Sequence, residues 1–220
     1  MKKLTLTFDN GPFEDGGTAH VLDTLASRGI RATFFLVGKQ ITESSQAIVR
    51  QAKAAGHWIG NHTLSHDFPL GHEDAATDHH LREIGQMDQL LGDLCEPVPL
   101  FRPYAGKGIL GAQVFTDAAL DYLSKTGHTV VLWNSVPRDW EHPPNAWVDR
   151  ALRDIDRNEW TTVVLHDRPN AAMKELPRFL DEVDRRGIEI VQQFPLDCTP
   201  MCAGKRMWDV SHLVRSRLGY

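Results

Sequence analysis

The chain has 220 residues, of which 41% are hydrophobic and 24% are charged, and its formal net charge is −5. This length suffices for one domain with a sizeable core, and a single α/β barrel can be this long. No block of basic residues predicts a nucleic-acid partner, and no apolar stretch is long enough to span a membrane. The composition does not indicate an oligomeric state.

The N-terminus and the cysteines bear on the cellular compartment. Residues 1–3 run directly into a strand pattern, which leaves no room for the apolar segment of a signal peptide. The three cysteines, Cys95, Cys198 and Cys202, form an odd set, as is typical of a reducing compartment. We therefore expect a cytoplasmic protein.

Strand and helix patterns alternate about seven times along the chain. Strands are expected at 4–8, 30–37, 57–60, 100–102, 128–133, 161–165 and 188–192, and helices at 18–28 (with Thr18 as N-cap), 44–55, 78–94, 112–125, 146–158 and 177–186. This alternation predicts an α/β fold with a mainly parallel sheet, either closed as a barrel or open and doubly wound. Residues 1–194 would form this domain, and 195–220 a tail that packs on it or extends from it as a short helix or arm.

Residues capable of chemistry lie at or just after the ends of five predicted strands. They are Asp9 with Asn10, His62 with His66, Arg102, Asp139 with Trp140, and His166. Each alone has a simpler interpretation, such as a turn cap, a solvated imidazole or a surface cation. Because α/β barrels build their active sites at the carboxyl ends of the strands, the five together predict an active site.

The spacing of His62 and His66 suggests a metal site. If both lie on one helical turn, residues i and i+4 face the same way. Two imidazoles can then bind one divalent metal and leave positions for an oxygen ligand and a water. The alternative is a helix start capped by Thr63 or Ser65, with both histidines exposed. An oxygen ligand at the end of the first strand favours the metal site.

The other three polar positions suggest acid–base chemistry. Arg102 beside a carboxylate would keep that acid ionised. Asp139 would orient His166 and stabilise its protonated form. His166 follows Val163, Val164 and Leu165, so it is expected to emerge from the most buried of the predicted strands.

Five segments resemble, in order, the five motifs of the polysaccharide deacetylase family, also called the NodB homology domain or carbohydrate esterase family 4. They are TFDNGP at 7–12, HTLSH at 62–66, FRPY at 101–104, RDW at 138–140 and VLHD at 164–167. The resemblance extends to about Phe194. It implies a distorted (β/α) barrel with about seven strands, and a hydrolase acting on a non-peptide carbon–nitrogen bond. The implied substrate is an N-acetylated amino sugar or a related small acylated amine, released as acetate and a free amine.

The resemblance also implies a role for each motif residue. Asp9 would be the general base, positioned and tuned by Arg102. His166 would be the general acid, supported by Asp139. The remaining roles are metal binding by Asn10, His62 and His66, and lining of the substrate pocket by Tyr104, Ala105, Trp140 and Leu165.

Two motifs depart from the family pattern. The family has a second Asp after the base as its third metal ligand, and this chain has Asn10. A neutral amide with two neutral imidazoles compensates a divalent cation poorly, so we expect weak metal affinity, with zinc the first choice. In the third motif, Tyr104 takes a proline position and Ala105 an aromatic one. The backbone N–H of Ala105 would still be available to stabilise an oxyanion.

Three hypotheses follow for the function. The first is a metal-dependent deacetylase that retains the six remaining motif residues. The second is a catalytically weak or silent relative that has lost a metal ligand and binds a saccharide. The third is a metal-independent amidase on the same fold.

Overall fold

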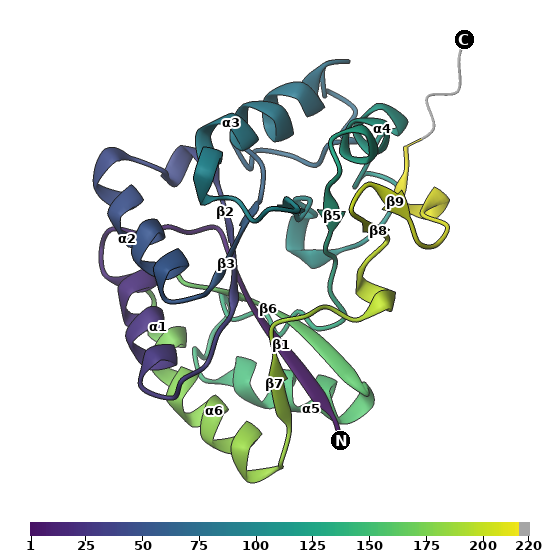
Figure 1. Ribbon diagram of the computed structural model, residues 1–220. Coiled ribbons are helices and arrows are strands. Elements are labelled where there is room, and N and C mark those ends of the chain that lie inside the picture. The colour runs from purple at the N-terminus through teal and green to yellow at the C-terminus, as the bar shows by residue number, and fades with distance from the viewer. Residues whose placement is uncertain (216–220) are drawn as a thin grey trace.

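The computed structural model describes residues 1–215 (Figure 1). Within them, the strands are β1 Lys3–Asp9, β2 Thr33–Leu36, β3 Trp58–Asn61, β4 Leu100–Phe101, β5 Thr129–Val130, β6 Trp160–His166, β7 Glu189–Val191, β8 Met201–Cys202 and β9 Lys205–Arg206. The α-helices are α1 Gly17–Ala26, α2 Glu43–Ala54, α3 Met87–Leu91, α4 Asp117–Lys125, α5 Ala146–Arg157 and α6 Leu176–Arg185. None of the described helices is long and apolar enough to cross a membrane.

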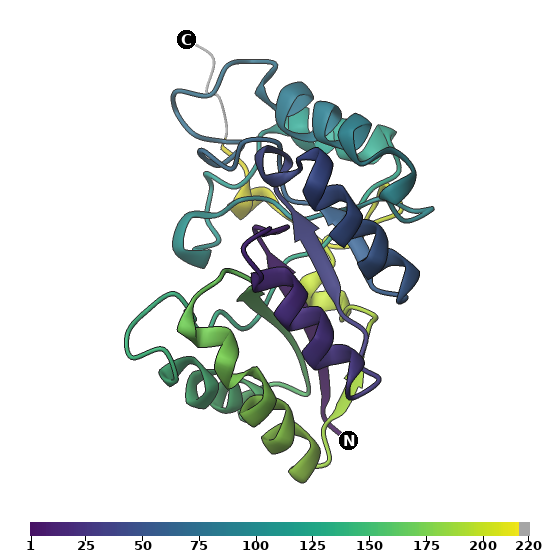
Figure 2. The same cartoon turned by 90° about the vertical axis from the view of Figure 1, so that its left-hand side faces the viewer.

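The strands form one curled sheet in the order β6-β1-β2-β3-β4-β5-β8-β9, and β7 pairs with β1. Neighbours from β6 through β5 run parallel, as the alternation of strands and helices predicts. The chain after β5 then meets β6 through an isolated bridge between Ser135 and Val163. The helices pack outside this curl, with α1 and α2 side by side in Figure 2. The prediction of an α/β, distorted-barrel fold is therefore confirmed.

Strand β1 pairs with three other strands, β6, β2 and β7. Its alternation separates two faces: Leu4, Leu6 and Phe8 belong to the main hydrophobic core under the helices. Thr7 and Asp9 face the other way, toward the interior of the curl. Asp9 is the last residue of β1 and pairs in register with His166 of β6. The sheet register itself thus brings the first and last motifs together.

Three expected helices differ from the structure. Residues 78–94 form a π-helical turn at Leu81–Gln86 that runs into the short α3. Residues 112–116 are not helical: Phe115 is bridged to Val214, and Thr116 is the N-cap of α4. The N-cap of α1 is Gly16, not Thr18, whose hydroxyl instead donates to Asp167. In the last two cases a partner distant in sequence outweighs the local helical pattern.

The tail from residue 195 adds to the same sheet. The short β8 pairs antiparallel with β5, and β9 folds back on β8. Met201 and Leu213 are buried in a second hydrophobic cluster that includes residues of β4, β5 and α4. In place of the expected helix or arm, the described part of the tail is a hairpin followed by a short 3₁₀ turn. Residues 216–220 of the predicted tail lie outside the described residues.

Candidate active site

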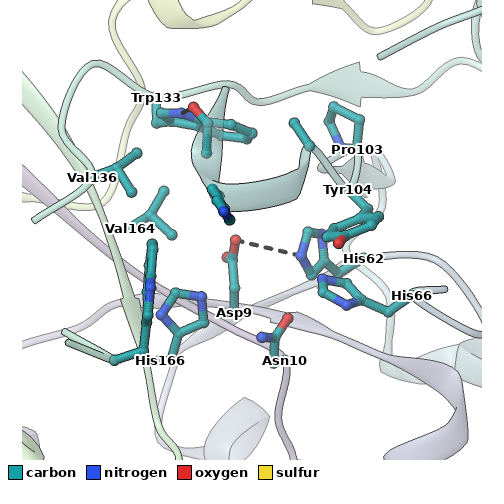
Figure 3. Close-up of a pocket in the computed structure, with 14 residues that line it drawn as sticks. Asp9, Asn10, His62, His66, Pro103, Tyr104, Trp133, Val136, Val164 and His166 are labelled. Atoms are coloured by element: carbon teal, nitrogen blue, oxygen red, sulfur yellow. Dashed lines mark hydrogen bonds and ion pairs between the residues drawn. The ribbon is translucent and has the colours of Figure 1, made fainter. Parts of the chain in front are cut away.

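A cavity of about 220 Å³ opens at the carboxyl ends of the parallel strands. Eight of the eleven predicted site residues line it: Asp9, Asn10, His62, His66, Tyr104, Ala105, Trp140 and His166. Figure 3 shows Asp9 between His166 on one side and His62 on the other. Arg102 and Asp139 do not line the cavity, but they form hydrogen bonds with Asp9 and His166, which do. The structure therefore gathers residues from all five motifs at one place.

Arg102 fixes the carboxylate of Asp9. Its side chain is fully buried, and Nη1 donates to Asp9 Oδ1 at 2.8 Å and to Thr7 Oγ1 at 2.6 Å. Nε donates to the carbonyl of Val131 at 3.2 Å, and the guanidinium lies 4.1 Å from the ring centroid of Phe35. Burial lowers the pKa of Arg102, and the charge of Asp9 opposes that effect. With Oδ1 held by Arg102, Oδ2 of Asp9 is left to face the cavity.

Asp139 holds His166 by two hydrogen bonds. Its Oδ1 lies 2.7 Å from His166 Nδ1, and its Oδ2 accepts the backbone N–H of His166 at 2.7 Å. The ring is therefore oriented with Nδ1–H on the carboxylate and Nε2 free. Burial alone would lower the pKa of His166. The negative charge of Asp139 and its hydrogen bond have a larger effect in the opposite direction, so the pKa of His166 is raised above its usual value. The Trp140 ring packs edge-on against the imidazole at 5.2 Å.

We expect Asp139→Asn to lower the pKa of His166, because the charge that favours the imidazolium is removed while an acceptor remains. NMR titration of the ring protons measures this. A raised folded-state pKa stabilises the fold fully below the unfolded value of about 6.5 and loses that contribution as pH rises through the folded value. Urea unfolding of the variant should lack this pH dependence. Asp149→Asn, at an exposed acid on α5, is the control. An unchanged His166 titration in Asp139→Asn would contradict the assignment.

The residues that could hold a cation are His62, His66 and Asn10, which all line the cavity. His62 Nδ1 lies 2.9 Å from the carbonyl oxygen of Arg102. Because a carbonyl only accepts, Nδ1 carries the proton and Nε2 keeps its lone pair. Burial lowers the pKa of His62, and it lowers that of His66 to about 2, with a further contribution from His62. Both rings are therefore neutral, which is the form that binds metals.

Two further observations fit a cation at this place. The lone pair on His62 Nε2 faces Asp9 Oδ2 at 3.5 Å, so two acceptors point at one another (Figure 3). The side-chain oxygen of Asn10 is buried and has no hydrogen-bond partner in the described chain, an arrangement that normally costs free energy. No group of three His, Cys, Asp or Glu side chains within residues 1–215 is placed to hold a metal, so the third donor would be an amide.

Three of the motif segments contain strained backbone conformations. Asn10, Thr63, His66 and Arg138 all have left-handed φ angles, of 77°, 72°, 56° and 55°. Such conformations in non-glycine residues are uncommon and cluster at functional sites.

The prediction of a helical turn at 62–66 is wrong, because the segment is an irregular loop after β3. The two imidazoles still lie together, with ring centroids 4.8 Å apart.

The walls of the cavity are largely apolar, and several wall residues were not predicted. Trp133, Val136 and Val164 line it, together with Lys107. Leu165 does not, contrary to the prediction, because side chains alternate along β6 and Leu165 points into the hydrophobic core. Its neighbour Val164 shares a face with His166. The strand period applied to β6 would have identified Val164 from the sequence.

Comparison with known proteins places the chain in a family. The polysaccharide deacetylase family profile matches residues 1–133, more than half of the chain, so the chain belongs to that family. A peptidoglycan-N-acetylglucosamine deacetylase from Bacillus cereus is 29% identical over 197 residues, covering 86% of this chain and 85% of the relative.

Two solved structures extend the comparison. A family 4 carbohydrate esterase from Streptomyces lividans, in complex with acetate, matches with a TM-score of 0.71 and 26% identity, over 91% of this chain and 97% of that one. A family 4 pseudoenzyme from Bacillus anthracis shares the fold, with a TM-score of 0.71 and 19% identity over 86% of this chain and 63% of that one. The chain is thus a deacetylase-like hydrolase, on a fold that also occurs in a pseudoenzyme.

Proposed function

We propose that this enzyme is a metal-assisted N-deacetylase of an N-acetylated amino sugar. The observation that carries the proposal is the carboxylate of Asp9, which is held by Arg102 on one oxygen and faces the neutral Nε2 of His62 with the other. The same cavity contains His166 and the unpaired oxygen of Asn10. Hydrolytic deacetylation is also the activity for which the Bacillus cereus relative is named.

Asn10, His62 and His66 would hold a divalent cation, for which zinc is our first choice because imidazole nitrogen suits it. Deacetylases of this family are generally metal-dependent. When bound, such an ion supplies Lewis acidity to the acetyl carbonyl and to a water molecule. The neutral donor set predicts a lower affinity than a site containing a carboxylate ligand.

The side chains divide the proton transfers between two sides of the cavity. Asp9 takes a proton from the attacking water, whose oxygen forms a bond to the acetyl carbon. His166 then gives the proton on Nε2 to the nitrogen as the carbon–nitrogen bond breaks, which leaves acetate and a free amine. Its raised pKa keeps that proton available near neutral pH. The N–H of Ala105, at the cavity wall, would stabilise the oxyanion.

The cavity favours a small substrate group. Its volume of about 220 Å³ lies below the range of about 300–1,000 Å³ typical for drug-sized ligands. It therefore fits an acetamido group and part of one sugar ring. Trp140, 40% exposed at the cavity, offers an apolar face to the ring.

Metal removal tests this proposal. We expect chelation followed by dialysis to abolish acetate release from N-acetylglucosamine oligomers, and added Zn²⁺ or Co²⁺ to restore it. Turnover that survives chelation would exclude the metal and favour a metal-independent amidase. Saccharide binding without acetate release at millimolar zinc would favour a silent relative.

A further inference from the structure

Glu83 is a buried acid that lies outside the cavity and outside all five motif segments. It occupies the π-helical turn Leu81–Gln86, and only 1% of its surface is exposed. Burying a carboxylate is costly unless its oxygens are hydrogen-bonded or paired. Arg82, which is half exposed, supplies one partner, with Nη2 at 3.0 Å from Oε1. The remaining partners lie in the loop that carries His62 and His66.

Three hydrogen bonds connect Glu83 to that loop. Oε2 accepts the backbone N–H of Ser65 at 2.8 Å, and Oε1 accepts the Ser65 hydroxyl at 2.9 Å. The backbone carbonyl of Glu83 accepts the N–H of Leu64 at 3.0 Å. Leu64 and Ser65 lie between His62 and His66 in the sequence. Glu83 therefore holds the middle of the segment whose two ends are the predicted metal ligands.

This segment needs such support because its own conformation is unfavourable. Thr63 and His66 have left-handed φ angles, which non-glycine residues rarely adopt and which persist only where the surrounding structure holds them. Neighbouring hydrogen bonds, such as that from the Thr63 N–H to Asn61 Oδ1 at 2.8 Å, involve neutral groups. The bonds from Ser65 to the Glu83 carboxylate are charge-assisted and roughly twice as strong.

We propose that Glu83 is a positioning residue, which fixes the 62–66 loop so that His62 and His66 present their rings to a common point. Its effect on metal affinity rests on the proposed function, whereas its effect on the loop does not. Outer-shell groups that orient metal ligands typically contribute about 10–100-fold to metal affinity. Glu83 acts one step further out, through the backbone that carries both ligands.

Glu83→Gln tests this role in the full chain, because an amide can serve Ser65 with only one acceptor oxygen. We expect amide hydrogen exchange at Leu64 and Ser65 to rise at least tenfold in the metal-free protein, with exchange in β1 unchanged. Isothermal titration with Zn²⁺ should give a Kd about 10–100-fold higher than that of the wild type. Ser65→Ala, which removes only the hydroxyl bond, should show the same changes to a smaller degree and serves if Glu83→Gln does not fold.

Glu96→Gln is the matched control. Glu96 is partly buried and accepts the backbone N–H of Ile59 at 3.2 Å, so it supports the same strand β3 away from the loop. This variant should leave exchange at Leu64 and Ser65 and zinc affinity unchanged. Unchanged loop exchange in Glu83→Gln, or an equal rise throughout the chain, would overturn the positioning role. If exchange rises locally but the wild type itself binds no zinc, the positioning role stands and the metal part of the proposed function fails.

Discussion

Asp9→Asn should lower kcat/KM for deacetylation by about 10²–10⁴-fold, the usual contribution of a positioned general base. The amide keeps the size of the side chain but cannot take a proton from water. Asp9 also lies next to residues on both sides of the site, because its carboxylate faces His62 at 3.5 Å and its backbone pairs in register with His166. Acetate release from N-acetylglucosamine oligomers at saturating zinc measures the loss. Asp23→Asn, at an exposed acid on α1, should retain full activity.

The same substitution should also destabilise the fold, because it leaves the charge of Arg102 buried without its partner. Breaking a buried ion pair in this way costs about 3–5 kcal/mol, measurable by urea unfolding. The double variant Asp9→Asn/Arg102→Met removes both charges and should recover much of that stability. It should recover none of the activity, which separates the chemical role of Asp9 from its structural one. Near-wild-type turnover in Asp9→Asn would contradict the assignment of the base.

Asn10→Asp should tighten zinc binding at least tenfold, equivalent to about 1.4 kcal/mol. The side-chain oxygen of Asn10 is already buried and unpaired beside the two neutral imidazoles. A carboxylate there would offer a divalent cation a charged ligand in place of a neutral amide. At limiting zinc the variant should therefore turn over faster than the wild type. Isothermal titration gives the affinity directly.

Asn10→Asp should shift Tm in opposite directions without and with zinc. Without metal, the new carboxylate lies next to Asp9 in a buried turn, so like-charge repulsion should lower Tm. With zinc in excess, tighter binding to the folded state should raise Tm above that of the wild type. Asn145→Asp, at the exposed N-cap of α5, should leave the effect of zinc on Tm unchanged. An unchanged Kd in Asn10→Asp would mean that Asn10 does not face the cation.

The sequence by itself determined the fold class and the place of the site. Alternating strand and helix periods imply parallel strands, and the carboxyl ends of parallel strands meet at one edge. That is why Asp9, His62 and His166 were predicted together although they are far apart in the chain. The pairing of Asp139 with His166 followed from the chemistry of an acid beside an imidazole, and the pairing of Arg102 with Asp9 from the family resemblance. The structure places both pairs at 2.7–2.8 Å.

Only the tertiary structure decided the conformation of the 62–66 loop and which residues enclose the cavity. Residues 62–66 form an irregular loop with left-handed φ angles at Thr63 and His66, and Glu83, some twenty residues further on, holds Ser65. Local spacing cannot reveal such a partner. Trp133 lines the cavity because the sheet is curled, which the strand pattern alone does not specify. The hairpin after residue 200 depends on a pairing with β5 that has no local pattern. Periodicity encodes which residues share a face, whereas long-range hydrogen bonds and strained backbone angles are set only when the chain is packed.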